Sequence, residues 1–550
     1  MKRDFSRLNG NAFDLLVCGG GIYGAWVAYD AALRGVKVAI VEQGDWAGAT
    51  SSASSKLIHG GLRYLETFDF ELVRKSLAER QMLLEAAPHR VWPLRFGVPV
   101  YGDSRIGSLR LKAGLALYDF LAGSLFGSGG AAMSHRHYNR EHFSARFPFL
   151  STNGLKGGFT YADAQTDDAR LVLEIIDGAM SQGAVCVNYC RLDGLIEEGG
   201  RAIGAMVQDR SDGSVGKVFA RQVVNATGCW MAEEGGNRCR LTKGVHLVLP
   251  GSGINEALLL TAKSDGRVFF VIPWYGRTLI GTTDTDYRGD PDDVAVEAED
   301  IAYLLTEANR YLNIGWGAGD VIGSYAGLRA LKYSDVAAPS AASRDWKLEI
   351  AGNGVHYSIG GKPTSAREDA ACIVNSVCGR LGLNAPCTTQ GKPFPWTPVP
   401  QMPIPRMPIP RPWIPAGNNA GKFPALEARA QQLGMDQECA AWLIRRHGKR
   451  VDEIFRSIAG DPGLASRIVP ALPFTYADLL FCAREEMVVH LDDLLRRRLP
   501  LLILASLDES ELRRLAGLVA PVLSWDEAAI GREIGNCKKR QCAQANPKSY

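Results

Sequence analysis

The chain has 550 residues, enough for roughly three or four domains, and 46% of them are hydrophobic, as in a globular protein. Its 62 lysines and arginines nearly balance 59 aspartates and glutamates, leaving a net charge of +3. This balance excludes a nucleic-acid-binding protein, which would carry a basic excess. Sixty glycines are more than usual and indicate many turns and close backbone approaches.

Cysteine usage and the chain start indicate the compartment. The 12 cysteines include no Cys-x-x-Cys pair, so neither a disulfide scaffold nor a metal site is expected. Residues Met1–Phe5 are charged and precede no apolar stretch, so no secretory signal is expected and the cytoplasm is the default location. The longest apolar run, Leu499–Ala505, is too short to span a bilayer.

The first recognisable unit is a βαβ motif near the N-terminus. Phe13–Cys18 reads as a short apolar strand and Val36–Val41 as a second one. Between them, Gly19–Gly24 predicts a turn and Ala25–Leu33 a helix, which Gly35 ends.

The middle of the chain is mixed in character. Residues 160–228 predict one helix and several short strands, and residues 243–335 mostly strands. A further strand is followed by a helix that runs through Arg380. The predicted elements are strands Ala202–Gln208, Val215–Phe219, Gln222–Asn225 and Val355–Ile359, and helix Val296–Leu312.

A proline-rich segment marks the clearest boundary. Between Pro393 and Pro415, 10 of 23 residues are proline, which predicts an extended, semi-rigid connector. Beyond it, residues 425–535 read as amphipathic helices, for example Tyr476–Arg498 and Asp508–Leu518.

The glycine turn of the βαβ unit predicts dinucleotide binding. Gly19, Gly21 and Gly24 fit Gly-x-Gly-x-x-Gly between a strand and a helix. The first makes the tight turn, the second lets the backbone approach a pyrophosphate, and the third lets the helix pack on the strand. Glu42 ends the second strand, where an acid accepts a hydrogen bond from a ribose hydroxyl.

A series of motifs then carries a resemblance to a known family. The longest is Ala49–Glu66, with the sequence Ala-Thr-Ser-Ser-Ala-Ser-Ser-Lys-Leu-Ile-His-Gly-Gly-Leu-Arg-Tyr-Leu-Glu, which closely resembles the FAD-dependent glycerol-3-phosphate dehydrogenases. Shorter matches follow in order over about residues 13–380: Asp167–Leu171, Asn225–Gly228, Lys243-Gly244 with His246, Gly281–Asp284 and Gly360–Lys362.

The resemblance implies a fold and a division of the chain. The expected fold class is α/β (α+β), with a Rossmann-like FAD-binding domain interleaved with an antiparallel-sheet substrate domain, plus a C-terminal helical domain. The oxidoreductase part would cover residues 1–392, followed by a linker over 393–415 and the helical domain over 416–550. Within the first part, FAD-binding segments are expected at about 13–75, 160–240 and 340–392, and the substrate segment at about 243–335.

The resemblance also implies an activity. It is the oxidation of sn-glycerol 3-phosphate to dihydroxyacetone phosphate, by hydride transfer from C2 to flavin N5, with electrons passing to a quinone. The alternatives are an oxidase that uses O2, an enzyme for a related phosphorylated polyol, and a non-catalytic flavin-binding scaffold. A homodimer and peripheral contact with the cytoplasmic face of a membrane are further expectations.

Several residues are expected to contact the cofactor. A second close approach of the backbone is predicted at Asn225–Gly228, after a strand, and a third at Gly360–Lys362, before a helix. With the turn and Glu42, the cofactor set is Gly19, Gly21, Gly24, Glu42, Thr50, Ser51, Ser52, Lys56, His59, Gly60, Gly61, Ala226, Gly228, Gly361, Lys362 and Thr364.

The substrate would be held by cations. A phosphate monoester carries nearly two negative charges, and Arg63, Arg329 and Lys362 match the family's phosphate-binding positions. His59 is the first candidate for the general base that removes the hydroxyl proton, with flavin packing as its alternative role. His246 is the second candidate base, and Tyr64 is a candidate donor to the substrate.

Two features depart from the family or go beyond it. After Gly361-Lys362 the family usually continues Leu-Thr-Thr-Tyr-Arg, whereas here Pro363–Arg367 reads Pro-Thr-Ser-Ala-Arg, with Ala366 in place of the tyrosine. Such a change near the phosphate lysine suits a related polyol phosphate as substrate. Residues 105–126 mix basic and apolar side chains, which indicates either a membrane-surface element or a helix packed on the substrate domain.

Overall fold

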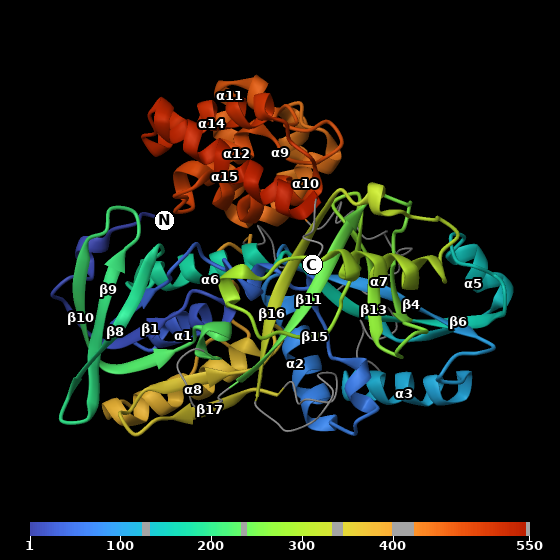
Figure 1. The fold of residues 1–550 in the computed structure, drawn as a ribbon, viewed down its shortest axis with the longest axis horizontal. Helices are drawn as coiled ribbons and strands as arrows, with labels where there is room; N and C mark the ends of the chain where they lie inside the picture. Colours follow the sequence, from blue (N-terminus) through green and yellow to red (C-terminus); the bar gives the residue numbers. More distant parts are fainter. Residues whose placement is uncertain (124–132, 233–238, 333–344, 399–422, 546–550) are drawn as a thin grey trace.

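The computed structural model describes residues 1–123, 133–232, 239–332, 345–398 and 423–545. Two mixed β-sheets lie side by side in this part of the chain, and a group of helices sits across one edge of both (Figure 1). The fold class predicted from the sequence is confirmed. The cleft that matters for function lies between the two sheets and the helical group.

The first sheet is the dinucleotide-binding layer. Its central strands run parallel, in the order β7, β2, β1, β10, β18, which is the arrangement that the N-terminal βαβ unit predicts. The segment predicted as two strands from Val215 is one long strand, because its first half pairs with β9 and its second with β1. Its strands are β1 (Ala12–Cys18), β2 (Val38–Val41), β7 (Val185–Val187), β8 (Cys190–Glu198), β9 (Arg201–Asp209), β10 (Val215–Asn225), β17 (Lys347–Ile350) and β18 (His356–Ile359).

Three helices cover one face of this sheet. Helix α1 (Ile22–Leu33) is buried almost all round, because it packs against both α6 (Asp168–Ser181) and α8 (Ala366–Leu381). Helix α8 stops at Gly382, which takes the left-handed conformation (φ +74°) that ends many helices.

The second sheet is mainly antiparallel and wider than the sequence predicted. It includes the strands of residues 91–166 as well as those of 243–335. The two groups are joined because β4 pairs with β6 on one side and with β12 on the other. Its strands are β3 (Leu57–Ile58), β4 (Val91–Tyr101), β5 (Arg136–Asn139), β6 (Leu155–Thr166), β11 (Cys239–Leu249), β12 (Ala257–Thr261), β13 (Val268–Trp274), β14 (Arg277–Gly281), β15 (Thr285–Asp286) and β16 (Gly323–Lys332). The accompanying helices are α2 (Phe70–Ala86), α3 (Ser108–Leu121), α5 (Arg140–Arg146) and α7 (Ala298–Asn309).

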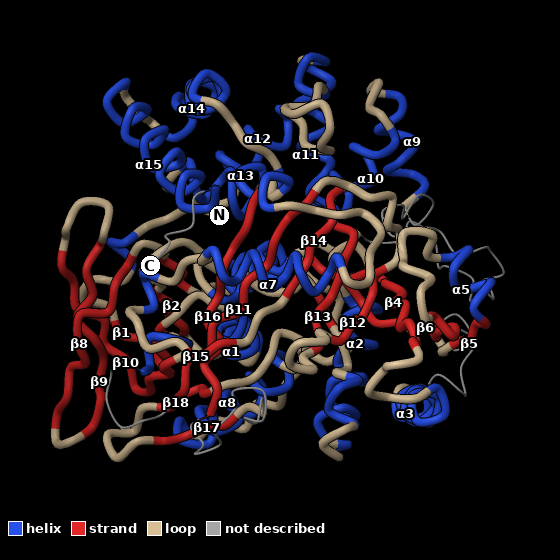
Figure 2. Tube along the Cα trace, turned by 45° about the vertical axis from the view of Figure 1, so that its right-hand side comes forward, coloured by secondary structure: helices blue, strands red, loops and turns tan. Residues whose placement is uncertain are grey.

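The C-terminal part is helical, as the tube in Figure 2 shows along the upper edge of the molecule. Its helices are α9 (Pro424–Gln432), α10 (Gln437–His447), α11 (Val451–Gly460), α12 (Tyr476–Glu485), α13 (Leu501–Leu504), α14 (Glu509–Leu523) and α15 (Glu527–Ala545). It shares an apolar core with the second sheet, where the rings of Trp442 and Tyr275 lie 4.1 Å apart.

One helix prediction in this part was wrong. Residues 476–498 are two segments, α12 and a short helical stretch at Asp493–Arg498. The break falls at Met487, which has φ +51°, a conformation that no helix continues through. The predicted linker lies mostly in residues 399–422, outside the described part of the chain.

Candidate active site

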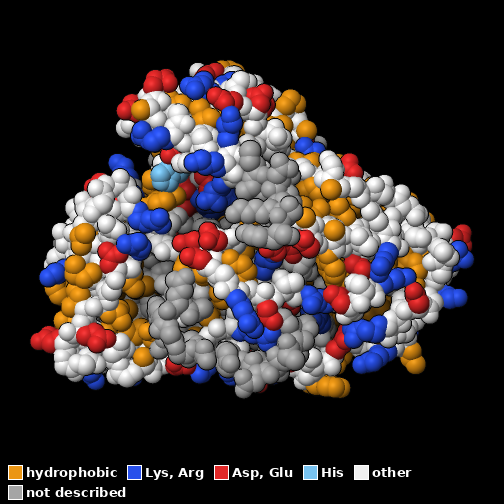
Figure 3. All heavy atoms as spheres, in the orientation of Figure 1, with side chains coloured by type: hydrophobic (Ala, Val, Ile, Leu, Met, Phe, Trp, Pro, Cys, Tyr) orange, Lys and Arg blue, Asp and Glu red, His pale blue; other side chains and the backbone are white. Residues whose placement is uncertain are grey.

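A deep cleft of about 1290 Å³ opens where the parallel strands of the first sheet end and the second sheet begins. Ligands of open α/β sheets bind at such carboxyl ends of strands. We call the part of the cleft near Glu42 the adenosine end, and the part near Lys362 the flavin end. In Figure 3, lysine and arginine side chains gather where the C-terminal helices meet the rest of the molecule.

The glycine turn after β1 has no room for side chains. Gly19 has φ +106°, and a Cβ there would lie 2.5 Å from the carbonyl oxygen of Ala226. A Cβ on Gly24 would lie 1.8 Å from the carbonyl oxygen of Gly19, so helix and strand pack in direct contact. Helix α1 begins just after this turn and aims its first N–H groups at the cleft, where a pyrophosphate is stabilised.

Glu42 is held ready at the adenosine end. Its carboxylate accepts the N–H of Gly20 at 2.6 Å and the N–H of Gly44 at 2.8 Å. Burial raises its pKa, while these two hydrogen bonds act in the opposite direction. Each oxygen keeps a lone pair, so the carboxylate can still accept the ribose hydroxyl that the sequence predicts.

The serine-rich loop forms the wall between the two ends. Ser51 accepts the N–H of Ile22 at 2.9 Å, and Thr50 donates to the carbonyl oxygen of Leu328 at 2.5 Å. These bonds tie the loop to the start of α1 and to strand β16 of the second sheet. The loop therefore spans both sheets along the line that the cofactor would follow.

At the flavin end a second glycine pair brings a tyrosine close to the backbone. A Cβ on Gly361 would lie 1.7 Å from the Tyr23 hydroxyl oxygen. That oxygen accepts the N–H of Lys362 at 3.1 Å, and the hydroxyl donates to Asp369 at 2.7 Å. The turn before α8 is thereby fixed against the dinucleotide-binding helix.

Lys362 is a buried cation without a hydrogen-bonding partner. Its Nζ makes no hydrogen bond to any described residue and lies 4.7 Å from the centre of the Tyr64 ring. Burial lowers its pKa to about 8, against the attraction of carboxylates led by Asp163. A buried ammonium that makes no hydrogen bond to the described residues indicates a place for an anionic ligand.

Arg329 lies on the opposite wall, on strand β16. It donates to Thr282 Oγ1 at 3.0 Å and lies 3.2 Å from Asp284. A Cβ on Gly244 would lie 2.5 Å from its guanidinium, so this glycine leaves room for the arginine. Arg329 and Lys362 both line the cleft, together with Arg63 and Tyr64.

His246 faces the same space from strand β11. Its Nε2 lies 2.8 Å from Ser55 Oγ, its ring stacks on Tyr325 at 4.9 Å, and its Nδ1 has no partner among the described residues. Burial lowers its pKa well below 6.5, and the charges of Arg329 and Lys56 act in the same direction. The imidazole is therefore neutral at physiological pH.

The structure brings most of the predicted site residues to one cleft. Those that line it are Gly19, Gly21, Glu42, Thr50, Ser51, Ser52, His59, Gly61, Arg63, Tyr64, Ala226, Gly228, His246, Arg329, Gly361 and Lys362.

Four predicted cofactor residues do not line the cleft. Lys56 is turned away, because its Nζ binds Asp168 at 2.7 Å and the carbonyl oxygen of Ser52 at 2.6 Å, so it supports the serine loop from behind. Gly24 serves helix packing, and Gly60 donates its N–H to Asp163 at 3.2 Å. Thr364 accepts the N–H of His59 at 3.2 Å.

Sequence reasoning missed several supporting residues. Tyr23 is one of the variable positions of the glycine motif, and Ser55 lies in the longest motif, yet neither was singled out. Thr282 and Asp284, the partners of Arg329, lie in the Gly281–Asp284 motif, which could have pointed to them.

Comparisons with known proteins identify the family of the chain. Residues 14–362 match the family described as FAD dependent oxidoreductase, which is the class that fold and cleft define. Residues 417–530 match the C-terminal domain of alpha-glycerophosphate oxidase. The chain is 36% identical to the glycerol-3-phosphate dehydrogenase of Synechocystis over 90% of each chain. It is 32% identical to the aerobic glycerol-3-phosphate dehydrogenase of Bacillus subtilis, over 96% of this chain and 94% of the relative.

A solved structure extends the comparison. The glycerol-3-phosphate dehydrogenase of Bacillus halodurans, complexed with FAD, superposes with a TM-score of 0.76 at 28% identity, over 99% of this chain and 97% of that one. The chain therefore belongs to the FAD-dependent glycerol-3-phosphate dehydrogenase family. Its cofactor is FAD, and the described residues fit it: a glycine cradle at one end, Glu42 for a ribose, and the unpartnered ammonium of Lys362 at the other end.

Proposed function

We propose that this protein oxidises sn-glycerol 3-phosphate to dihydroxyacetone phosphate and passes the electrons to a quinone. The observation that carries the proposal is Lys362, a buried ammonium that makes no hydrogen bond to any described residue, in the same cleft as Arg63 and Arg329. A phosphate dianion is the ligand that such a group of cations binds best. Relatives that cover most of the chain are named for glycerol 3-phosphate.

Arg329 and Lys362 would bind the phosphate in different ways. The planar guanidinium of Arg329, oriented by Thr282 and Asp284, offers a fork to two phosphate oxygens. Lys362 adds a point charge from the wall that carries Gly361. With the phosphate anchored, C2 of a three-carbon substrate is placed beside the flavin end, and FAD, when bound there, accepts the hydride that leaves this carbon.

The proton of the C2 hydroxyl needs a separate acceptor, and His59 suits this role better than His246. Both imidazoles line the cleft. Burial and the cations Arg329 and Lys56 oppose protonation of His246. We assign to His59 the removal of the proton, and to neutral His246 a hydrogen bond that orients the substrate. His59→Gln should lower kcat, whereas His246→Gln should mainly raise KM.

The departure after Lys362 supports glycerol 3-phosphate over a larger polyol phosphate. Ala366, which replaces the family's usual tyrosine, is fully buried at the start of α8 and does not line the cleft. Pro363 lines the cleft but adds no polar group. The two changed residues therefore add no polar group to the cleft that would bind the extra hydroxyl groups of a larger polyol phosphate.

The substrate is tested by anaerobic reduction of the bound flavin. Glycerol 3-phosphate should bleach the 450 nm band, whereas glycerol and longer polyol phosphates should do so much more slowly. A spectrum unchanged by millimolar glycerol 3-phosphate would leave the non-catalytic scaffold as the better reading. The acceptor is tested in the same preparation, where a quinone analogue should be reduced much faster than hydrogen peroxide appears in air. The predicted homodimer stays a prediction.

A peripheral membrane position is the last part of the proposal. Among the described residues, no helix combines the length and apolar character needed to cross a bilayer. However, helix α3 exposes Leu109 (84%) and Phe120 (56%), and Phe68 (75%) is exposed just before the neighbouring helix α2. Both helices lie at the lower edge of the molecule in Figure 1. Exposed basic residues accompany them on the same segment: Arg105, Arg110 and Lys112.

This surface has the composition of a monotopic membrane contact. Leu109→Asp with Phe120→Asp should abolish co-sedimentation with anionic vesicles. The matched control is Leu518→Asp, because Leu518 is also an exposed leucine but lies on the C-terminal helix α14. Equal binding by all of these proteins would contradict the proposed surface.

A further inference from the structure

The C-terminal helical domain forms buried ion pairs with the loop that follows Glu42. Asp45, in this loop, is fully buried and accepts hydrogen bonds from two consecutive arginines of the short helical stretch after α12. Arg497 Nε lies 2.6 Å from its Oδ2, and Arg498 lies 2.5 Å from Oδ2 and 2.9 Å from Oδ1. Burial favours the neutral carboxyl, but Arg498 and Arg497 outweigh it and lower the pKa of Asp45.

A second contact between the helical domain and this loop lies one residue further along the chain, at Trp46. The indole N–H of Trp46 donates to the sulfur of Met487 at 3.3 Å, and Asn188 donates to the Met487 carbonyl oxygen at 3.1 Å. Met487 is the residue at which the predicted long helix breaks. The break therefore places the helical domain directly on the loop.

The same loop forms the underside of the cofactor cradle. A Cβ on Gly20 would lie 2.4 Å from the Trp46 ring, so indole and glycine turn are in direct contact. Ala47 donates its N–H to the carbonyl oxygen of Gly20 at 3.1 Å, and Gly44 donates its N–H to Glu42. One short loop thus connects the helical domain to both the pyrophosphate turn and the ribose acid.

We propose that Asp45, Arg497 and Arg498 are positioning residues for FAD, through which docking of the C-terminal helical domain sets the affinity for the cofactor. The contacts reach the glycine turn through Asp45 and Trp46, and Asp45 and Arg497 also line the cleft. Without these contacts the loop can change its conformation. The backbone amides of the glycine turn and the Glu42 carboxylate are then no longer held in the positions that bind FAD. The inference concerns FAD retention and is independent of the proposed substrate.

A second buried network between the same two parts of the chain offers a matched control. Arg170, on α6, pairs in a fork with Glu486, and both side chains are fully buried. This pair joins the helical domain to the first part of the chain at α6, but the Glu486 carboxylate also lies 4.0 Å from Arg498. The control is therefore Asp478 of the same network, which among the described residues pairs with Arg446 and His447 and not with Asp45, Arg497 or Arg498.

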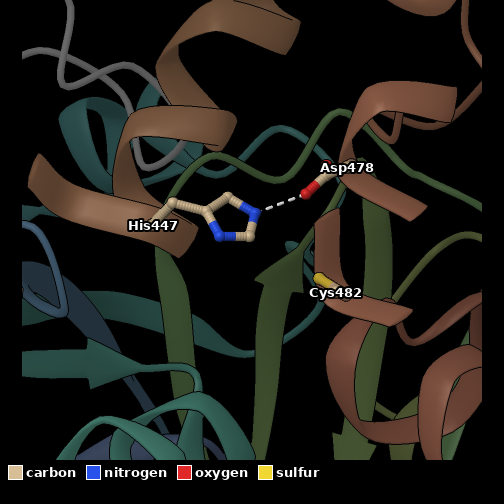
Figure 4. A group of neighbouring side chains, drawn as sticks. All are labelled: His447, Asp478 and Cys482. Atoms are coloured by element: carbon tan, nitrogen blue, oxygen red, sulfur yellow. Dashed lines mark hydrogen bonds and ion pairs between the residues drawn. The ribbon is translucent and has the colours of Figure 1, made fainter. Parts of the chain in front are cut away.

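The neighbouring side chains of that network are drawn in Figure 4. His447 and Asp478 lie 2.5 Å apart, with Cys482 beside them. The other ring nitrogen of His447 faces Arg170 at 3.2 Å, and Asp478 also pairs with Arg446. Arg170 and Arg446 lie beside this group, and both ring nitrogens of His447 face a charged side chain. The group is therefore an ion-pair network rather than a metal site.

The test compares FAD dissociation constants of full-length variants after removal and titration of the flavin. Asp45→Asn should raise the Kd for FAD at least about tenfold, because two guanidiniums lose their shared charge partner. Arg498→Lys, which keeps the charge but not the fork, should give a smaller rise. Asp478→Asn, the same change at a buried carboxylate of the helical domain, should lower the melting temperature of the FAD-free chain yet leave the Kd within about twofold of the native value.

Two results would overturn the proposal. One is an unchanged Kd in Asp45→Asn, and the other is an equal rise in Asp45→Asn and Asp478→Asn at equal loss of melting temperature. If Asp45→Asn does not fold, Met487→Ala decides, since it leaves the ion pairs of Asp45 in place and removes the sulfur that accepts the Trp46 N–H. It should raise the Kd about threefold, and an unchanged Kd would count against the proposal.

Discussion

The two ends of the cleft differ in how completely their polar groups are satisfied. At the adenosine end, Glu42 accepts two backbone amides and Asp45 binds two arginines. At the flavin end, Lys362 Nζ and His246 Nδ1 have no hydrogen-bonding partner among the described residues. Because an unpaired buried polar group costs free energy, the flavin end is built to be completed by a ligand, whereas the Glu42 and Asp45 carboxylates at the adenosine end are already held by the protein.

The largest effect is expected at the substrate-binding cations. Arg329→Met removes a fork-shaped donor from the flavin end, and kcat/KM for glycerol 3-phosphate should fall about 1000-fold, since charge-assisted hydrogen bonds to a phosphate are each worth up to about 3 kcal/mol. Steady-state kinetics measures this. The control is Arg240→Met, because Arg240 pairs with Asp286 on the neighbouring strand outside the cleft, and its kcat/KM should be nearly native.

At the adenosine end the expected loss is in cofactor affinity instead. In Gly19→Ala the new Cβ would meet the Ala226 carbonyl oxygen at a left-handed backbone position. Strain of this kind should weaken FAD binding about 100-fold. Flavin titration of the FAD-free variant measures it. Gly35→Ala is the control, because Gly35 is also left-handed but nothing lies within 4 Å of its Cβ position. Equal weakening in both variants would contradict the steric argument.

How much of this could be predicted from the sequence depends on distance along the chain. Gly19, Gly24 and Glu42 follow from one local βαβ pattern, and the structure gives the two glycines the close packing predicted. Lys56 lies in a motif that suggested the cofactor, but its partner Asp168 is more than 100 residues away. Arg498 meets Asp45 across some 450 residues, and no local pattern signals such a pair.

A smaller effect with a distinct pH signature is expected at Lys362. Burial lowers its pKa to about 8, so the ammonium is lost as the pH rises through this value and phosphate binding weakens. The native kcat/KM should therefore fall above pH 8. Lys362→Met should lower kcat/KM about 30-fold at pH 7 and remove this basic limb. A basic limb that persists in the variant would assign it to another group.

The smallest effect is expected from the Tyr64 hydroxyl. Tyr64→Phe keeps the ring that faces the Lys362 ammonium and removes only one hydrogen-bonding group. KM should rise about threefold with kcat unchanged. Tyr64→Leu also removes the ring and should cost more, and the reverse order would show that the ring is dispensable.

The most direct test asks whether the flavin end recognises phosphate. Anaerobic stopped-flow reduction of the bound flavin should be compared for glycerol 3-phosphate and glycerol, which differ only in the group that Arg329 and Lys362 would bind. The account predicts saturable reduction by glycerol 3-phosphate, with a ratio of rate to dissociation constant about 1000-fold above that of glycerol. Equal reduction by glycerol, or none by glycerol 3-phosphate, would contradict it.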